Sequence, residues 1–257
     1  LQSYLQDKYA SFLLGDHGLG SALAYVACRV LLPLGLYFDA KMRHIHCHRG
    51  ESRRLLDIGC GNGEFLDRAR QFGWEVAGVD FDPLAVAAAR SRGLDIRQGG
   101  VEAVDQDSRF DIITLSHVIE HVYDPADLIR RCVLLLDTGG ILWLETPNIE
   151  SIGYRIYRSN WRGLEPPRHL VLFNREALID TLKNAGLNRV SQKCHGLSGI
   201  YMALSSERIM DRSRPCRSAL MCLGRSFAKS ARLILVEVVQ LISRKRREYL
   251  TVVATKN

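Results

Sequence analysis

The chain lacks the cysteine spacing of a disulfide framework. Its seven cysteines form no C-x-x-C pair and leave one unmatched, so we expect reduced thiols and a cytoplasmic protein rather than a secreted one. The first residues also lack the charged stretch, apolar core and small-residue cleavage site of an export signal, which agrees with that expectation. Internal repeats and low-complexity segments are absent from the sequence too, and this excludes solenoid arrays.

Acidic residues are scarce in one late part of the chain, residues 208–247. This segment holds eleven Lys and Arg against only Asp211 and Glu237, which gives it a net charge of +9 in a chain of net charge +7. Inside it, the apolar stretch 231–243 predicts a helix too short to cross a bilayer. We favour a helical cap packed on the rest of the domain, with contact to an anionic membrane surface or an amphiphilic substrate as the alternative. Nucleic acid is the weakest partner for this segment, because Phe227 is its only aromatic residue.

One long hydrophobic run, residues 19–38, would be long enough to span a bilayer, but Arg29 and Pro33 interrupt it. We therefore expect a helical N-terminal cap over residues 1–50 rather than a membrane span. Three histidines alternate in "HIHCHRG" (44–50), a pattern that would suit a metal ion if a second ligand cluster accompanied it. Because no such cluster appears, we expect a solvated end of the cap and no metal site.

From residue 53 onward, apolar strands alternate with helical stretches. Strands are predicted at 54–58, 75–79, 94–97, 110–115, 140–145, 189–194 and 249–256, and helices at 63–72, 83–92, 124–136 and 173–187. This alternation indicates parallel βαβ units in a doubly wound, Rossmann-like α/β sheet. The basic segment falls between the last two strands as a helical insert of about residues 198–247. We expect one domain over residues 51–257.

A glycine-rich turn follows the first predicted strand, in "LLDIGCGNGEFL" (55–66). Gly59, Gly61 and Gly63 permit positive φ and close approach of a ligand to bare backbone. The next strand ends at Asp80, an acid placed to hold a ribose diol. Turn, strand context and acid together predict a site for a nucleoside-containing cofactor.

The acids around the turn distinguish between cofactors. Asp57 and Glu64 would repel a pyrophosphate, whereas Asp57 suits a positively charged ammonium or sulfonium. Here the sequence resembles the class I S-adenosylmethionine-dependent methyltransferases: "DIGCGNG", "GVDFDP", "FDIITLSHVIEHV" and "GGILWLETPN" match their first, second, fourth and fifth motifs. The resemblance implies a seven-stranded, mostly parallel sheet whose last strand is antiparallel, with S-adenosyl-L-methionine as the cofactor. The cofactor-binding residues expected from it and from the strand ends are Asp57, Gly59, Cys60, Gly61, Asn62, Gly63, Asp80, Phe81, Val101, Glu102, Ser116 and His117.

The third motif departs from the family. Relatives usually carry Asp or Asn after its glycine, where that side chain meets the adenine amino group, but this chain has Gly100. The backbone of Val101 or the carboxylate of Glu102 would have to substitute. Within the same resemblance, Phe81 would pack on the adenine face and Asp80 would hold the ribose hydroxyls.

Candidate catalytic residues follow the fourth predicted strand, because ligands bind at the carboxyl ends of strands in such sheets. Methyl transfer depends on alignment, and an oxygen or nitrogen acceptor usually needs a base. Ser116, His117, Glu120 and His121 lie at this edge, with His121 one helical turn after His117 and on the same face. The alternative for His121 is that it caps or packs a short helix.

A second constellation is "NWRGLEPPRHLVLFNREAL" (160–178), in which Pro166 and Pro167 stiffen an extended loop. It resembles a signature of a methyltransferase group related to the ubiquinone-biosynthesis O-methyltransferases. The loop could fold over the cofactor site, which makes His169 the first candidate for a general base or substrate ligand. The alternative is that His169 only pins the loop through a hydrogen bond. The candidate catalytic residues are therefore His169, His117 and His121.

These patterns predict an enzyme that moves a methyl group from S-adenosyl-L-methionine to a small-molecule or lipid-like acceptor, by preference at oxygen. The alternatives are N-methylation or RNA modification by the same fold, and a non-catalytic methyltransferase-like binding module. The glycine motif and Asp80 argue against the binding module. We expect a cytoplasmic location, with membrane association through the basic segment left open.

Overall fold

The computed structural model describes residues 42–45, 53–194, 197–213 and 219–257. The predicted cap over residues 1–50 and the apolar run 19–38 lie almost wholly outside these residues, so both stay predictions.

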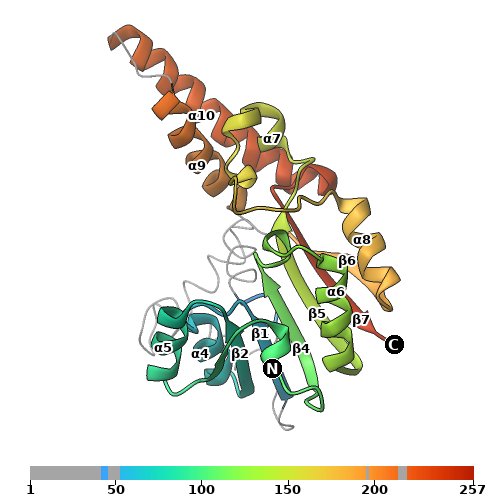
Figure 1. The fold of residues 1–257 in the computed structure, drawn as a ribbon. Helices are drawn as coiled ribbons and strands as arrows, with labels where there is room; N and C mark the ends of the chain where they lie inside the picture. Colours follow the sequence, from blue (N-terminus) through green and yellow to red (C-terminus); the bar gives the residue numbers. More distant parts are fainter. Residues whose placement is uncertain (1–41, 46–52, 195–196, 214–218) are drawn as a thin grey trace, which may run out of the picture.

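A seven-stranded sheet forms the centre of the molecule, in the order β3-β2-β1-β4-β5-β7-β6 (Figure 1). β7 runs antiparallel to its neighbours β5 and β6, and the other neighbouring strands are parallel. This confirms the predicted Rossmann-like α/β sheet with an antiparallel last strand. The strands are β1 (Arg53–Ile58), β2 (Trp74–Asp80), β3 (Asp95–Gln98), β4 (Phe110–Ser116), β5 (Leu136–Pro147), β6 (Leu187–Gln192) and β7 (Tyr249–Lys256).

Helices connect the strands and begin where the sequence offers caps. Asp82, Asp124 and Asn174 each accept a hydrogen bond from a backbone N–H in the first turn of the helix that follows. The α-helices are α4 (Glu64–Gln71), α5 (Pro83–Ser91), α6 (Pro125–Leu135), α7 (Ile152–Tyr157), α8 (Arg175–Asn184), α9 (Ser198–Ser213) and α10 (Ala219–Ile242). Short 3₁₀ turns are η1 (Val101–Ala103), η2 (Ile119–His121), η3 (Arg158–Asn160), η4 (Arg162–Leu164) and η5 (Arg244–Arg246).

The central strands are apolar on both faces because each face is covered. Leu55 of β1 packs in one buried cluster with residues of α4 and α5, while Leu56 packs in a second cluster with α6 and α8. Ile112 and Ile113 of β4 divide between the two clusters in the same way. Neighbouring side chains on a strand point to opposite faces, so this continuous apolar pattern fixes a sheet between two helical layers.

The predicted helical insert of about residues 198–247 consists of α9, α10 and η5. Its two long helices pack against each other and project beyond one end of the sheet (Figure 1). Arg232 of α10 donates to the buried Glu207 of α9 at 2.6 Å, and Tyr157 of α7 donates to the same carboxylate at 2.9 Å. These contacts attach the pair, called the α9–α10 arm below, to the domain. Among the described helices, none combines the length and apolar character that crossing a membrane requires.

Candidate functional site

The glycine turn after β1 is held against the end of β2. Gly59 donates from its backbone N–H to the carbonyl of Val79 at 2.9 Å, and Gly61 donates to Asp80 Oδ2 at 2.7 Å. Gly61 has φ of +54°, and a Cβ atom added there would meet nothing within 4 Å. The structure therefore brings the predicted acid onto the predicted turn and leaves open space over the backbone at Gly61.

Asp57 is fully buried at the end of β1, below this turn. Its Oδ1 accepts hydrogen bonds from Arg43 and from Thr114, the latter at 2.8 Å. Its Oδ2 is also buried and has no hydrogen-bond partner among the described residues. Burial raises the pKa of Asp57, against the opposing effect of Arg43 and Thr114. An unpaired buried acceptor suits a donor supplied by a ligand, such as an ammonium group.

The predicted adenine side of the site lies beyond β2 and β3. Phe81 is 70% exposed there. The Glu102 carboxylate accepts the backbone N–H of Gly100 at 2.8 Å, whereas Val101 is buried. A Cβ at Gly100 would lie 2.9 Å from the Phe81 ring and 2.6 Å from a Glu102 oxygen. A side chain at this position would therefore require the ends of the Phe81 and Glu102 side chains to shift, and the carboxylate of Glu102 lies next to the place of the missing Asp or Asn.

A cavity of about 470 Å³ opens at the carboxyl edge of the sheet. Four of the predicted cofactor residues line it: Cys60, Asn62, Ser116 and His117. Burial and the nearby Asp57 and Asp80 carboxylates raise the pKa of Cys60 to about 12, so its thiol stays protonated and is no nucleophile. The walls also include residues that sequence reasoning missed, namely Arg43, Trp143, Glu145, Tyr201 and Tyr249.

His117 sits between two carboxylates. Its Nδ1 lies 3.1 Å from Glu120 Oε1 and its Nε2 lies 3.5 Å from Glu145 Oε1. Burial lowers the pKa of His117, but hydrogen bonds to both carboxylates outweigh it and raise the pKa to about 10. Near neutral pH the imidazole is therefore a charged donor in the cavity wall, without the lone pair that a general base needs.

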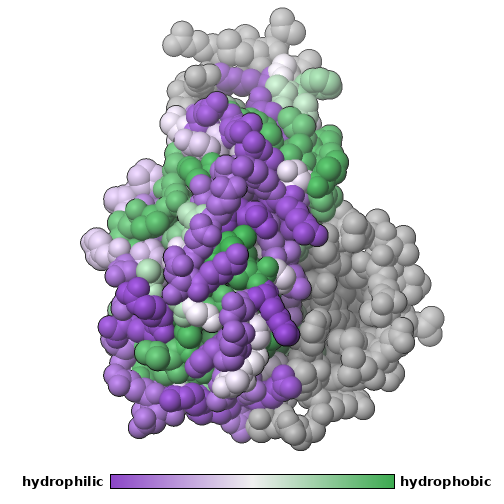
Figure 2. Space-filling model, turned by 90° about the vertical axis from the view of Figure 1, so that its right-hand side faces the viewer, coloured by the Kyte–Doolittle hydropathy of each residue, from purple (hydrophilic) through white to green (hydrophobic). Residues whose placement is uncertain are grey.

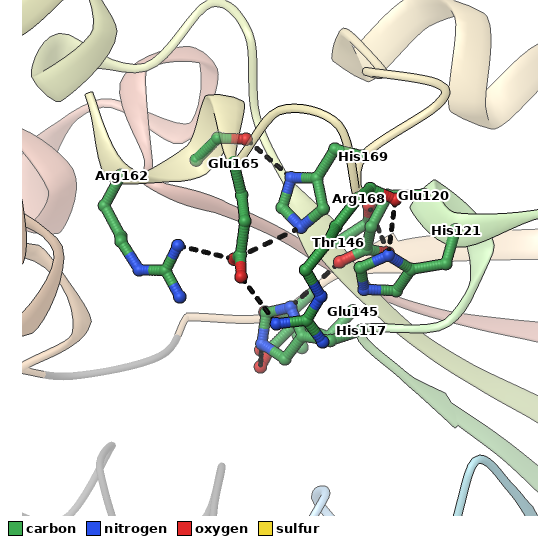
Figure 3. Close-up of polar contacts among 11 residues, drawn as sticks. His117, Glu120, His121, Glu145, Thr146, Arg162, Glu165, Arg168 and His169 are labelled. Carbon is green, nitrogen blue, oxygen red and sulfur yellow. Dashed lines mark hydrogen bonds and ion pairs between the residues drawn. The ribbon is translucent and has the colours of Figure 1, made fainter. Parts of the chain in front are cut away.

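His121 and His169 lie together in a neighbouring cluster, shown in Figure 3. Their ring centroids are 4.8 Å apart. His121 Nδ1 bonds to the carbonyl of Arg168 at 2.8 Å, and His169 Nδ1 bonds to the carbonyl of Gly163 at 2.7 Å. His169 thus makes the hydrogen bond that the alternative expects, and its Nε2 lies 3.7 Å from a carboxylate oxygen of Glu165. Its role as a base or substrate ligand stays a prediction.

The expected common helical face of His117 and His121 is wrong. His117 has a left-handed φ of +55°, and only a 3₁₀ turn, η2, follows it over Ile119–His121. Because the chain turns sharply at His117, that ring contacts Tyr249 and Glu145, while His121 turns to the loop that carries His169. The fully buried Glu120 links the cavity at His117 to the cluster at His121. Its carboxylate forms a hydrogen bond with His117 Nδ1 and accepts another from Thr146 at 3.0 Å.

Some of the missed residues left a signal in the sequence. Glu145 stands near the carboxyl end of β5, the edge where ligands bind in such sheets. Tyr249 begins an antiparallel strand and pairs with Pro147, so it arrives at that same edge. Arg43 comes from the short segment before β1, and no pattern around it indicates that it reaches Asp57.

The strand order, the glycine turn and the acid at the end of β2 define a methyltransferase domain of the S-adenosylmethionine-dependent class. A family of proteins described as a methyltransferase domain matches residues 20–192, more than half of the chain, and the chain belongs to this family. The resemblance predicted from the motifs is confirmed.

Among curated proteins, ubiquinone biosynthesis O-methyltransferases are similar to this chain. The protein from Xanthomonas campestris pv. campestris is 36% identical over 134 residues, which cover 49% of this chain and 48% of the relative. The protein from Xanthomonas oryzae pv. oryzae is 40% identical over 103 residues, covering 37% and 43%. The chain therefore matches about half the length of these relatives or less.

Solved structures share the fold at low identity. A methyltransferase from Archaeoglobus fulgidus gives a TM-score of 0.52 at 21% identity, covering 91% of this chain and 93% of its own. Phosphoethanolamine N-methyltransferase 2 of Haemonchus contortus, in complex with S-adenosyl-L-methionine, gives 0.55 at 19% identity, covering 84% and 51%. The [4+2]-cyclase SpnF gives 0.56 at 18% identity, covering 87% and 81%. Since a cyclase and a methyltransferase share this fold, function has to be argued from the site.

Proposed function

We propose that this protein transfers a methyl group from S-adenosyl-L-methionine to a small-molecule acceptor. The observation that carries the proposal is the Asp80 carboxylate bonded to the backbone of Gly61, whose two chain neighbours, Cys60 and Asn62, line the 470 Å³ cavity. In this assignment Asp80 holds the ribose hydroxyls, Phe81 packs on the adenine and Glu102 meets its amino group. The unpaired Oδ2 of Asp57 accepts from the ammonium of the methionine moiety. The cofactor supplies an electrophilic methyl on its sulfonium, and the chain has to align the acceptor behind it.

We place the acceptor on the side of the cavity lined by His117, Tyr201 and Tyr249. Burial and Glu145 raise the pKa of Tyr249 far above its ordinary value, so Tyr249 stays a neutral phenol that donates a hydrogen bond. His121 and His169 do not line this cavity, but their cluster adjoins it through Glu120, which contacts His117. With Nδ1 donating to a carbonyl, Nε2 of either neutral ring has the lone pair that a base needs. Oxygen is the acceptor atom we favour, because the ubiquinone-biosynthesis relatives are named O-methyltransferases. The alternatives are N-methylation, as in the Haemonchus contortus protein's name, and RNA modification.

The first test is the affinity for S-adenosyl-L-methionine, measured by calorimetry. Asp80→Ala should weaken binding at least tenfold, because charged hydrogen bonds to the ribose are each worth about 1.5–3 kcal/mol. Asp95→Ala is the matched control: an exposed acid at the start of the adjacent strand β3, for which no change is expected. Equal affinities for the Asp80 and Asp95 variants would reject the ribose assignment. If the unaltered protein did not bind the cofactor at all, the enzyme proposal itself would fail and a binding module would replace it.

We also propose that the α9–α10 arm contacts an anionic membrane surface. Exposed apolar residues on α10 recur at helical spacing along one face: Phe227, Ile234, Leu235, Val238 and Ile242. Hydrophobic surface also gathers on the upper part of the face drawn in Figure 2. The basic residues of the segment favour anionic lipid over a neutral partner.

Co-sedimentation with anionic lipid vesicles tests the membrane contact. Replacing Phe227 and Ile234 together by Ser should lower the pelleted fraction at least tenfold, since each buried side chain contributes about 1.5–3 kcal/mol. Tyr123→Ser provides the control, because Tyr123 is more exposed than Phe227 and Ile234 but lies outside the arm. Equal pelleting of the two variants would contradict the membrane proposal and leave packing against another part of the protein as the role of this face.

A further inference from the structure

Three side chains beyond the tip of β4 gather their donor atoms at one point. Glu120 and His121 belong to η2, and His169 comes from the loop after η4 (Figure 3). One ligand atom from each lies within 4.8 Å of the other two. The sequence predicts Glu120 and His121 at this edge of the sheet, and the return of the loop after η4 brings His169 beside them.

Both imidazole rings are already oriented as metal ligands are. A carbonyl oxygen only accepts, so the contacts of His121 Nδ1 with Arg168 and of His169 Nδ1 with Gly163 place the proton on Nδ1 of each ring. In the neutral rings the Nε2 atoms then carry the lone pairs. Histidines that bind metals typically donate their other ring N–H to a backbone carbonyl or carboxylate, which fixes the tautomer and the ring plane.

The third donor is a buried carboxylate. Glu120 is fully buried, and His117 and Thr146 hold its two oxygens at 3.1 and 3.0 Å. Each carboxylate oxygen has a second lone pair, so both contacts are compatible with coordination. A further carboxylate oxygen, on Glu165, lies 3.7 Å from His169 Nε2. Cations balance both acids, because His117 contacts Glu120 while Arg162 and Arg168 pair with Glu165. What favours a metal ion is therefore the set of donor atoms itself, two imidazole nitrogens and one carboxylate.

We propose that Glu120, His121 and His169 bind a divalent transition-metal ion, with its remaining coordination positions open to water or to an oxygen of a ligand. Two imidazole nitrogens and one carboxylate suit Zn²⁺ or a similar ion, whereas Mg²⁺ and Ca²⁺ prefer sets made of oxygen alone. Ligands about 2.0 Å from one ion lie about 3.3 Å apart. The three atoms thus need to close by about 1.5 Å at most, and rotation of the partly exposed His121 side chain supplies this movement. An ion here would occupy the lone pairs that otherwise suit a base, and its binding does not depend on methyl transfer.

The test measures metal binding directly and does not depend on enzymatic activity. The full chain, stripped with a chelator, is titrated with Zn²⁺ in a calorimeter without cofactor, and the bound zinc is counted after dialysis. We expect one tightly bound ion, and an affinity at least 100-fold lower for His121→Ala and for His169→Ala. The matched control replaces His44, His46 and His48 together by Ala, which removes the other histidine-rich stretch and should leave the tight site intact.

Three results would overturn the proposal: no tight ion in the unaltered protein, unchanged affinity in both His variants, or loss of the ion in the control. If the buried His169 variant does not fold, His121→Ala alone decides, because its side chain is partly exposed. X-ray absorption of the zinc-loaded protein adds a second measurement, in which two imidazoles at about 2.0 Å are expected. A spectrum without imidazole scattering would contradict the assignment.

Discussion

Replacing Asp57 by Ala is expected to lower the free energy of unfolding by about 3–5 kcal/mol and to abolish measurable cofactor binding. Arg43 donates to this carboxylate, and its own side chain is only 11% exposed. Removing the acid would leave a guanidinium largely buried without its partner, which is the most costly way to break an ion pair. Urea unfolding gives the stability, and calorimetry with S-adenosyl-L-methionine gives the affinity.

Two further variants separate the charge from the shape. Asp57→Asn keeps an oxygen for Arg43 and Thr114, so we expect a smaller loss of stability with a clear loss of cofactor affinity. The double variant Asp57→Leu with Arg43→Met removes both charges and should recover most of the stability lost by Asp57→Ala. If Asp57→Ala costs less than about 1 kcal/mol, Arg43 does not form this buried pair in solution.

The sheet could be predicted because its information is local. Leu55 and Leu56 are both apolar since adjacent residues of a strand covered on both faces must both be buried. The positions of the glycine turn and of Asp80 could also be predicted from the sequence, because a strand, a turn and the end of the next strand occupy fixed places in a parallel sheet. The bond between Gly61 and Asp80 is therefore the part of the site that sequence reasoning reached most directly.

The arrangement of the three candidate catalytic histidines could not be predicted in the same way, because it depends on contacts between segments that are distant in the sequence. A left-handed φ such as that of His117 is uncommon for any residue other than glycine, so helical spacing gave a wrong direction for His121. The approach of His169 to His121 requires the loop after η4 to return to the tip of β4, where Leu170 donates to the carbonyl of Glu120 at 2.8 Å. No short-range pattern encodes such a return.

The segment that leads into that loop, from α7 to Trp161, is attached to a buried acid, Glu248, and removal of this acid is the second large effect we expect. Glu248 Oε1 accepts from the Gly153 N–H at 2.7 Å, and its Oε2 accepts from Trp161 Nε1 at 3.0 Å. Glu248→Ala would leave both donors buried without a partner, at a cost of about 2–5 kcal/mol in unfolding free energy. Glu150→Ala is the control, because Glu150 forms only a partly exposed ion pair with Lys245 and should change stability by less than about 0.5 kcal/mol. Similar losses in the two variants would show that Glu248 does not anchor this segment.

The same carboxyl predicts a pH dependence of stability. Burial raises the pKa of Glu248 from 4.5 to about 7, although the Gly153 and Trp161 donors favour the charged form. Between these two values the folded chain keeps a proton that the unfolded chain has released, so stability falls as pH rises through this window, by about 3 kcal/mol in all. Glu248→Gln has no proton to lose, and its urea-unfolding free energy, measured from pH 4.5 to 8, should lack this decrease. Parallel curves for the variant and the unaltered protein would mean that Glu248 titrates at its ordinary value, which requires water to reach the carboxylate and would remove the basis for its buried contact with Trp161.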